Sequence, residues 1–255
     1  MRLENSFIPV TGVGPATERG LWAAGVTHWD AFTPDAVGEK TGRRIAAYID
    51  LARERLDDGD ADFFADALPS RSRWRMYENF RDSTAFFDIE TTGLSPDRHD
   101  VTVVTVHRDG DTRTLVRGRD LTTAALADAF AGATVLVSFN GKRFDVPFLE
   151  RSFEIDLDRP HIDLMYPCRR ADLSGGLKAI ERDLGIDRDD PELSGEDAVR
   201  LWREHRRGDA GALETLVRYN RDDTVNMRRV LHHVVDRLTD TIFRSHLPPQ
   251  ATLAD

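Results

Sequence analysis

The sequence predicts an α/β fold in which a mixed sheet is flanked by helices and preceded by a small helical module. Three short runs rich in β-branched residues follow one another between residues 85 and 117, and helix and strand patterns then alternate to about residue 164. Strands joined by short turns favour an antiparallel meander, and the later alternation favours parallel strands joined by crossovers. Helical periodicity dominates both ends of the chain.

These patterns divide the chain into four parts. Residues 1–66 form the helical module, with helices expected at about 15–24, 28–32 and 41–56 and an acidic connector after them. Residues 67–84 are a connector rich in arginine and aromatic residues, 85–245 hold the sheet, and 246–255 are expected to be a flexible tail. The expected strands are 85–91, 101–107, 112–117, 134–139 and 161–164, and the expected helices of the sheet domain are 121–131, 145–152, 177–184, 196–206 and 210–238.

Composition limits the function classes. A formal net charge of −10 argues against a protein that coats nucleic acid by bulk electrostatics, although an enzyme can still bind nucleic acid locally. No apolar run approaches the roughly 20 residues of a membrane helix, and the N-terminus does not resemble a secretion signal, so we expect a cytoplasmic protein without membrane contacts. Cys168 has no second cysteine to pair with, and no Cys/His spacing indicates a zinc site. Any metal would therefore have oxygen ligands.

Two acids interrupt the first apolar strand. Asp88 and Glu90 are two residues apart, so the alternation of a strand places both on one face of the sheet. Neighbouring buried acids repel each other unless a cation lies between them, which favours a divalent metal with oxygen ligands. The alternative is a strand edge with two solvated acids.

A third acid follows the strand expected at 134–139. This strand breaks at Asn140 and Gly141, and a helix then begins with Asp145. Asp145 would lie at a helix N-terminus above the carboxyl end of the strand, where sheet enzymes place their chemistry. The alternative is a residue that only caps the helix.

The last predicted helix carries the fourth acid. Tyr219 and Asp223 are four residues apart and therefore share a face of the helix. Asp223 lies on the apolar stripe that includes Leu216 and Met227, whereas Asp222 lies on a polar face. Periodicity thus selects Asp223 as the functional acid and predicts that Asp222 is solvated.

The three segments together resemble a known family. Phe87-Asp-Ile-Glu-Thr-Thr-Gly-Leu94, Asn140-Gly-Lys-Arg-Phe-Asp145 and Tyr219-Asn-Arg-Asp-Asp223 resemble, in this order, the three motifs of the DEDD superfamily. These are DnaQ-like and polymerase-proofreading 3′–5′ exonucleases with a ribonuclease H-like fold, here in the branch that carries a tyrosine. Within this superfamily the closer likeness is to stand-alone predicted exonucleases, and the resemblance spans about residues 85–237.

The resemblance implies an activity and a site. Asp88, Glu90, Asp145 and Asp223 would be the metal ligands, and Tyr219 would orient the attacking water. Thr91, Thr92, Gly93, Leu94, Asn140 and Phe144 would line the pocket of the terminal nucleotide. Two divalent cations, Mg²⁺ or Mn²⁺, would activate the water and stabilise charge during in-line attack on the phosphodiester, with Asp88 bridging both ions. The expected partner is nucleic acid, with DNA favoured over RNA and single-stranded DNA favoured as substrate.

The N-terminal module has its own motif. Gly12-Val13-Gly14 leads into a helix and resembles the hairpin of helix-hairpin-helix modules, which present backbone N–H groups to a phosphate. The alternative is an ordinary glycine-proline helix entry. In the connector, the segment Arg71–Arg81 with Trp74 and Tyr77 either clamps single strands or packs across the edge of the core.

Several functional alternatives stay open at the sequence level. His161 and Asp163 either assist the site or are buried structural residues, and His232 and His233 are interpreted as structural. The chain could be a nucleic-acid-binding protein with an inactive or regulatory nuclease fold, or an endonuclease that cuts structured DNA. Product lengths would separate these functions.

Overall fold

The structure is a computed structural model that describes residues 1–189 and 192–249, in two compact units. One unit is formed by Met1–Arg81 together with the residues from Val234 onward, and the other by Asp82–His233. The predicted tail lies partly outside the described residues, which end in a 3-10 turn, Arg244–His246, and three further residues. No helix in the described part of the chain is long and apolar enough to cross a membrane.

The second unit contains the predicted mixed sheet, which is confirmed. Among the described residues its strands lie in the order β3-β2-β1-β4-β5. The first three strands are antiparallel neighbours, and β4 and β5 run parallel to β1. The bounds are β1 Thr84–Thr91, β2 Val101–Arg108, β3 Asp111–Val116, β4 Val135–Ser138 and β5 His161–Asp163.

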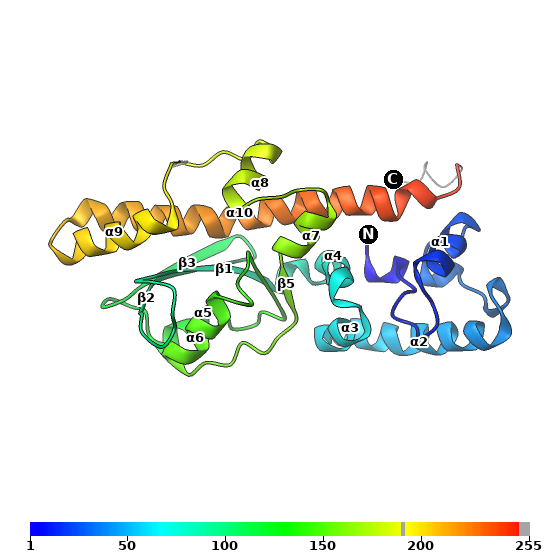
Figure 1. The fold of residues 1–255 in the computed structure, drawn as a ribbon. Coiled ribbons are helices and arrows are strands. Elements are labelled where there is room, and N and C mark those ends of the chain that lie inside the picture. Colours follow the sequence, from blue (N-terminus) through cyan, green and yellow to red (C-terminus); the bar gives the residue numbers. More distant parts are fainter. Residues whose placement is uncertain (190–191, 250–255) are drawn as a thin grey trace. The chain divides into compact units, whose positions relative to one another are not determined.

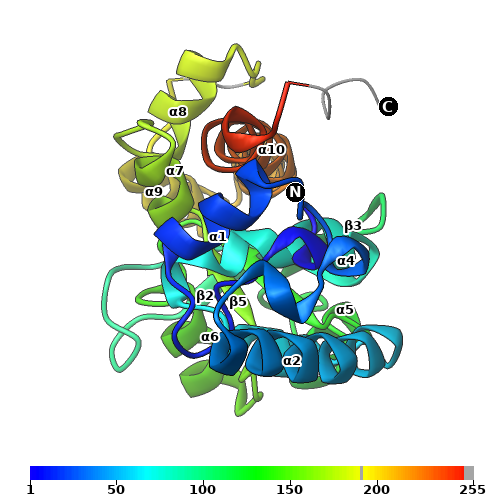
Figure 2. The ribbon, with the colours of Figure 1, turned by 90° about the vertical axis from the view of Figure 1, so that its right-hand side faces the viewer.

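Helices cover both faces of this sheet (Figure 1). On one face, Phe87 and Ile89 of β1 pack with α5 and α6 in a buried apolar cluster. On the other face, Val103 of β2 packs with α9 and the first half of α10, through residues such as Trp202 and Leu216. The helices of this unit are α5 Thr123–Ala129, α6 Asp145–Phe153, α7 Met165–Arg170, α8 Leu177–Leu184, α9 Gly195–Arg206 and α10 Ala210–Ile242, the last of which continues into the first unit and is viewed along its axis in Figure 2.

The first unit is helical, as expected, but its details differ from the sequence prediction. Its helices are α1 Pro15–Ala23, α2 Glu39–Asp57, α3 Ala61–Ala67 and α4 Tyr77–Phe80. The prediction of an acidic connector after α2 is wrong at the end of that connector, because Asp60 accepts a hydrogen bond from the Phe63 backbone and so caps α3. The short helix expected after Thr27 is a 3-10 turn, Trp29–Ala31, capped by His28.

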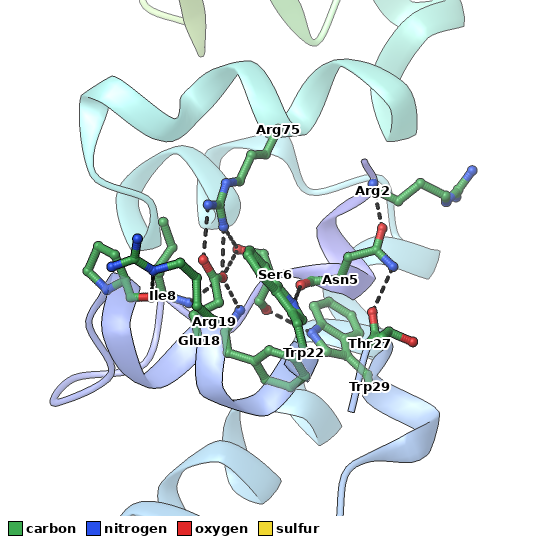
Figure 3. Close-up of polar contacts among 12 residues, drawn as sticks. Arg2, Asn5, Ser6, Ile8, Glu18, Arg19, Trp22, Thr27, Trp29 and Arg75 are labelled. Carbon is green, nitrogen blue, oxygen red and sulfur yellow. Dashed lines mark hydrogen bonds and ion pairs between the residues drawn. The ribbon is translucent and has the colours of Figure 1, made fainter. Parts of the chain in front are cut away.

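A buried ion pair fastens the start of the chain to the connector (Figure 3). The Glu18 carboxylate accepts two hydrogen bonds from Arg75, at 2.8 and 3.0 Å, and one each from the Ser6 hydroxyl and the backbone N–H of Phe7. Glu18 and Arg75 are 1% and 2% exposed, so each charge depends on the other for compensation. The connector therefore packs into the unit.

The strand-clamp interpretation of the connector is wrong. Trp74 is 2% exposed and Tyr77 is fully buried, so neither ring has a free face on which a base could stack. Much of the connector is helical, because a 3-10 helix spans Ser70–Met76 and leads directly into α4.

Candidate metal centre

β1 places two acids on the face of the sheet that α10 covers. Phe87 and Ile89 face the α5 and α6 side, so the alternation of the strand turns Asp88 and Glu90 the other way. The pairing of β1 with β2 shifts by one residue between Glu90 and Thr91. Such a bulge bends a strand and is common beside functional sites.

α10 brings Asp223 to these acids. Asp88, Glu90 and Asp223 each contribute a carboxylate oxygen to a group in which all these atoms lie within 4.8 Å of one another. Asn220, one helical turn before Thr224 and fully buried, donates a hydrogen bond from Nδ2 to Asp88 Oδ2 at 2.7 Å. Sequence reasoning missed Asn220, which lies next to Tyr219 and is fully buried.

Asp145 reaches the same region from the loop after β4. Gly141 allows this loop to pass close to the strand, because a Cβ at this position would lie 2.2 Å from Ser138 Oγ. Asp163 on β5 holds the loop by accepting a hydrogen bond from the Asn140 backbone at 2.8 Å. Asp145 then begins α6 and is 4% exposed.

The four carboxylates perturb one another. Burial raises the pKa of Asp88 well above its ordinary value, and the charges of Asp145, Asp223 and Glu90 raise it further. The pKa of Glu90 is also raised well above its usual range, by burial and then by Asp223 and Asp145. Burial raises the pKa of Asp145 to about 7. A divalent cation would relieve this repulsion and has a preference for carboxylate oxygens, so these residues fit such an ion.

Cationic side chains from the α8 region also reach the cluster. The guanidinium of Arg188 donates a hydrogen bond to Asp223 and forms an ion pair with Glu181 at 2.9 Å. The ammonium of Lys178 lies 4.5 Å from the ring centroid of Tyr219 and has no hydrogen-bond partner among the described residues. Sequence reasoning missed Lys178, Glu181 and Arg188, because nothing in the spacing of residues 178–188 indicates that these side chains face α10.

Tyr219 is close both to these cations and to the acids. Burial raises the pKa of its phenol, and the charges of Asp223 and Glu90 raise it further, so the hydroxyl stays protonated at neutral pH. Burial raises the pKa of Asp223. A hydrogen bond with Tyr219 lowers this pKa in part. The phenol can therefore act as a hydrogen-bond donor in the site.

A cavity of about 790 Å³ opens beside the acids. Five of the six predicted pocket residues line it, namely Thr91, Gly93, Leu94, Asn140 and Phe144. Thr92 lies outside it, because its hydroxyl accepts a hydrogen bond from the Asp100 backbone at 3.0 Å. Leu94 is 85% exposed at the edge of the cavity. The start of α9 also lines the cavity, through Ser194, Gly195, Glu196 and Val199, which sequence reasoning missed.

The remaining candidate residues have other surroundings. His161 Nε2 lies 2.8 Å from Ser138 Oγ, and burial lowers the pKa of His161 to about 3, so it is a neutral residue of the interior. Gly12 adopts a φ of +94°, and Gly14 is the N-cap residue of α1, while only a 3-10 turn, Leu3–Asn5, precedes them. The binding of a nucleic-acid backbone by Gly12 and Gly14 stays a prediction.

One comparison with known proteins identifies the family of the sheet unit. A model of the RNase_H superfamily matches residues 85–235, which is more than half of the chain. No match was found among curated proteins.

Similar solved structures have low sequence identity. One described as the apo form of the nuclease is 20% identical, covers 64% of this chain and 77% of its own, and has a TM-score of 0.45. Brucella melitensis NrnC bound to pGG is 18% identical, with coverages of 67% and 80% and a TM-score of 0.42. The Aedes aegypti Nibbler EXO domain is 13% identical, with coverages of 70% and 88% and a TM-score of 0.45.

Proposed function

Because the chain belongs to the RNase H superfamily, we propose that it is a metal-dependent 3′–5′ exonuclease that hydrolyses phosphodiester bonds of nucleic acid, with single-stranded DNA as the favoured substrate. The observation that carries the proposal is the convergence of Asp88, Glu90 and Asp223 within 4.8 Å beside an open cavity. Three carboxylates so close together cost free energy unless they bind a cation.

The four acids are not equally placed to bind that cation. Asp88, Glu90 and Asp223 form the group whose oxygens converge, and Asp145 lies close enough to Asp88 to raise its pKa. Two divalent cations, Mg²⁺ or Mn²⁺, would supply activation of a water and stabilisation of the charge that develops on the phosphate. Asn220 fixes the orientation of Asp88 through its amide hydrogen bond.

Tyr219 is the residue that orients the attacking water. Its hydroxyl is held protonated by burial and by the surrounding carboxylates, so it serves as a donor and not as a general base. Its place beside Asp223, one helical turn away, directs that donor toward the acids.

The cavity has the size and lining that a terminal nucleotide needs. Its volume of about 790 Å³ lies in the range of roughly 300–1,000 Å³ that is common for small-molecule sites. Leu94 and Phe144 offer apolar surface for a base, and Asn140 and Thr91 offer polar groups. A pocket for one chain end favours removal of nucleotides one at a time over internal cutting.

A digestion experiment tests the proposal. Single-stranded DNA and RNA of one sequence, labelled at the 5′ end, are incubated with the protein and Mg²⁺ or Mn²⁺, with EDTA and Asp223→Asn as controls. A metal-dependent ladder that shortens in single-nucleotide steps supports the proposal, and a stronger ladder from DNA supports the preference. A single internal cut would indicate an endonuclease, and binding without cleavage would indicate a nucleic-acid-binding protein with an inactive fold.

A further inference from the structure

A second cavity, away from the acids, is lined almost entirely by basic side chains. It has a volume of about 460 Å³ and lies where β2 and the β2–β3 turn meet α10. Its lining comprises His107 from β2, Gly110 from the β2–β3 turn, and Val225, Arg228, Arg229, His232 and His233 from α10. None of these residues is acidic, in a protein with a formal net charge of −10.

The periodicity of α10 explains how these residues gather. Arg221, Val225, Arg228 and His232 follow one another at intervals of four, three and four, so they form a stripe along one side of the helix. From Arg221 to His232 the stripe covers 11 helical steps, or about 16 Å at roughly 1.5 Å per residue. Arg221 and Arg229 are exposed, and Arg228 is half-buried.

The arginines in this cavity are not neutralised by the protein itself. Among the described residues, no carboxylate forms an ion pair with Arg221, Arg228 or Arg229. Arg229 donates a hydrogen bond only to the neutral amide of Asn226, at 3.4 Å. The positive charge at this surface is therefore available to an outside anion.

His107 lies close enough to these arginines for their positive charge to affect its pKa. Arg228 Nη1 lies 3.5 Å from His107 Nε2, and His107 Nδ1 lies 2.7 Å from the Thr112 hydroxyl. Because a guanidinium can only donate, the contact requires a neutral ring with its lone pair on Nε2. Burial lowers the pKa of His107, and the charges of Arg228 and Arg221 lower it further, while the nearby Asp111 raises it in part.

The cavity is not suited to a metal ion. His107, His232 and His233 supply three imidazoles, but within the described residues the only group of His, Cys, Asp or Glu with converging ligand atoms is the acidic one. Two arginines among the imidazoles would also repel a cation.

A neighbouring cavity of mixed charge extends from this one toward Arg188. It has a volume of about 620 Å³, shares His107, Val225 and Arg229 with the first and adds Arg221 and Arg188. Arg188 is the residue that binds Asp223. This cavity also contains Asp187, Asp189 and Asp222, so the purely basic part is the one farther along α10.

We propose that the cavity around Arg228 and Arg229 binds backbone phosphates of a nucleic-acid strand whose end lies at the acidic site, an inference that rests on the proposed nuclease function. A strand is favoured over a small anion because the stripe is about 16 Å long, which exceeds the size of one phosphate, and because Arg221 at one end of the stripe lines the same cavity as Arg188. Arginine suits phosphate because its planar fork can donate two parallel hydrogen bonds.

Binding measurements with matched variants test the site. The affinity of the protein for a fluorescent 20-nucleotide single strand is measured in EDTA, which prevents cleavage, over a series of KCl concentrations. We expect Arg228→Gln/Arg229→Gln to weaken binding about tenfold, and to reduce the slope of log K against log salt by about 1.4, because each phosphate contact contributes roughly 0.7. The control Arg203→Gln/Arg206→Gln removes the same charge from the exposed side of α9 and should change neither quantity.

Two further readouts separate the failure of this inference from the failure of the nuclease proposal. Cleavage of a dinucleotide, which is too short to reach the cavity, should be unchanged in the Arg228→Gln/Arg229→Gln variant. A protein that cleaves strands but binds them equally well with and without these arginines would overturn the inference and leave the nuclease intact. A protein that binds strands through these arginines but cleaves nothing would overturn only the nuclease proposal.

The source of the phosphate is tested by competition. Inorganic phosphate is added to the complex with the labelled strand at constant ionic strength. We expect it to displace the strand only at concentrations far above that of the oligonucleotide. Displacement by inorganic phosphate and by unlabelled strand at equal concentrations would identify a small-anion site and overturn the assignment to a strand.

Discussion

Arg188 binds Asp223 with the same guanidinium that pairs with Glu181, and its side chain is only 4% exposed. A fixed positive charge therefore lies against a carboxylate that we assign to the metal centre. A metal ion bound there would share the Asp223 carboxylate with the guanidinium, whose charge repels it. Arg188 and a metal ion thus compete for Asp223.

The first prediction concerns this competition. A hydrogen bond between charged groups contributes about 1.5–3 kcal/mol, so Arg188→Met should bind Mn²⁺ about tenfold more tightly or better. The same variant should be less stable in EDTA, because Glu181 loses the partner of its buried charge. Calorimetric titration and thermal unfolding measure the two effects, with the exposed Arg113→Met as control. Unchanged or weaker Mn²⁺ binding would show that the guanidinium does not leave Asp223.

The second prediction concerns the repulsion among the acids. Asp88→Asn keeps the shape of the side chain but removes the carboxyl group whose pKa is raised by burial and by the charges of Asp145, Asp223 and Glu90. Without metal, the variant should be more stable than the wild type by on the order of 1 kcal/mol, the equivalent of roughly one pKa unit. It should also lose the stabilisation by Mn²⁺. Urea unfolding in EDTA and in Mn²⁺ tests both, and a less stable variant in EDTA would contradict the proposed crowding of charge.

The third prediction concerns pH. A carboxylate whose pKa is higher in the folded protein contributes stability that is present below its unfolded pKa and is lost as the pH rises through the folded value. The folded pKa of Asp145 is about 7, and that of Asp88 is raised well above the ordinary 3.8. The metal-free protein should therefore become less stable from pH 6.5 to pH 8.

Mn²⁺ should remove most of this loss of stability, because a bound cation compensates the carboxylate charges that protons neutralise at lower pH. His161 acts in the opposite direction and only slightly in this window: its pKa is lowered from 6.5 to about 3, so most of its effect on stability is lost below pH 6.5. Thermal unfolding with and without Mn²⁺ at both pH values is the measurement. A metal effect that is equal at pH 6.5 and pH 8 would argue against protonated acids in the metal-free site.

The fourth prediction concerns the first unit. Arg75→Met leaves the Glu18 carboxylate buried at 1% exposure without its cation, which should cost about 3–5 kcal/mol. Replacing both residues by apolar ones, Glu18→Leu/Arg75→Met, should restore much of that loss. Chemical denaturation of the two variants compares them, and equal stabilities would show that the penalty does not come from an unpaired charge.

The sequence was sufficient where a periodic pattern and an unusual residue coincide. The alternation of β1 predicted that Asp88 and Glu90 share a face, and the 3.6-residue period of α10 separated Asp223, which is 9% exposed, from the half-buried Asp222. The alternation of helix and strand patterns along the chain also predicted the mixed sheet. The first two features are local, because each depends only on residues within one element.

The parts that sequence missed depend on contacts between distant segments. Arg188 contacts Asp223 across 35 residues, and Arg75 contacts Glu18 across 57. No spacing rule relates such pairs. The short helices α3 and α7 were missed for a related reason, since helices of six or seven residues gain their stability from packing and carry little periodic signal of their own.

The most direct test of the account compares cleavage by three proteins that differ at single acids. Wild type, Asp88→Asn and Asp222→Asn are incubated with 5′-labelled single-stranded DNA and Mn²⁺, and initial rates are measured. We expect Asp222→Asn to cleave at nearly the wild-type rate and Asp88→Asn to lose at least a thousandfold, about 4 kcal/mol of transition-state stabilisation. Cleavage by Asp88→Asn at the wild-type rate would contradict the assignment of this cluster as the catalytic centre.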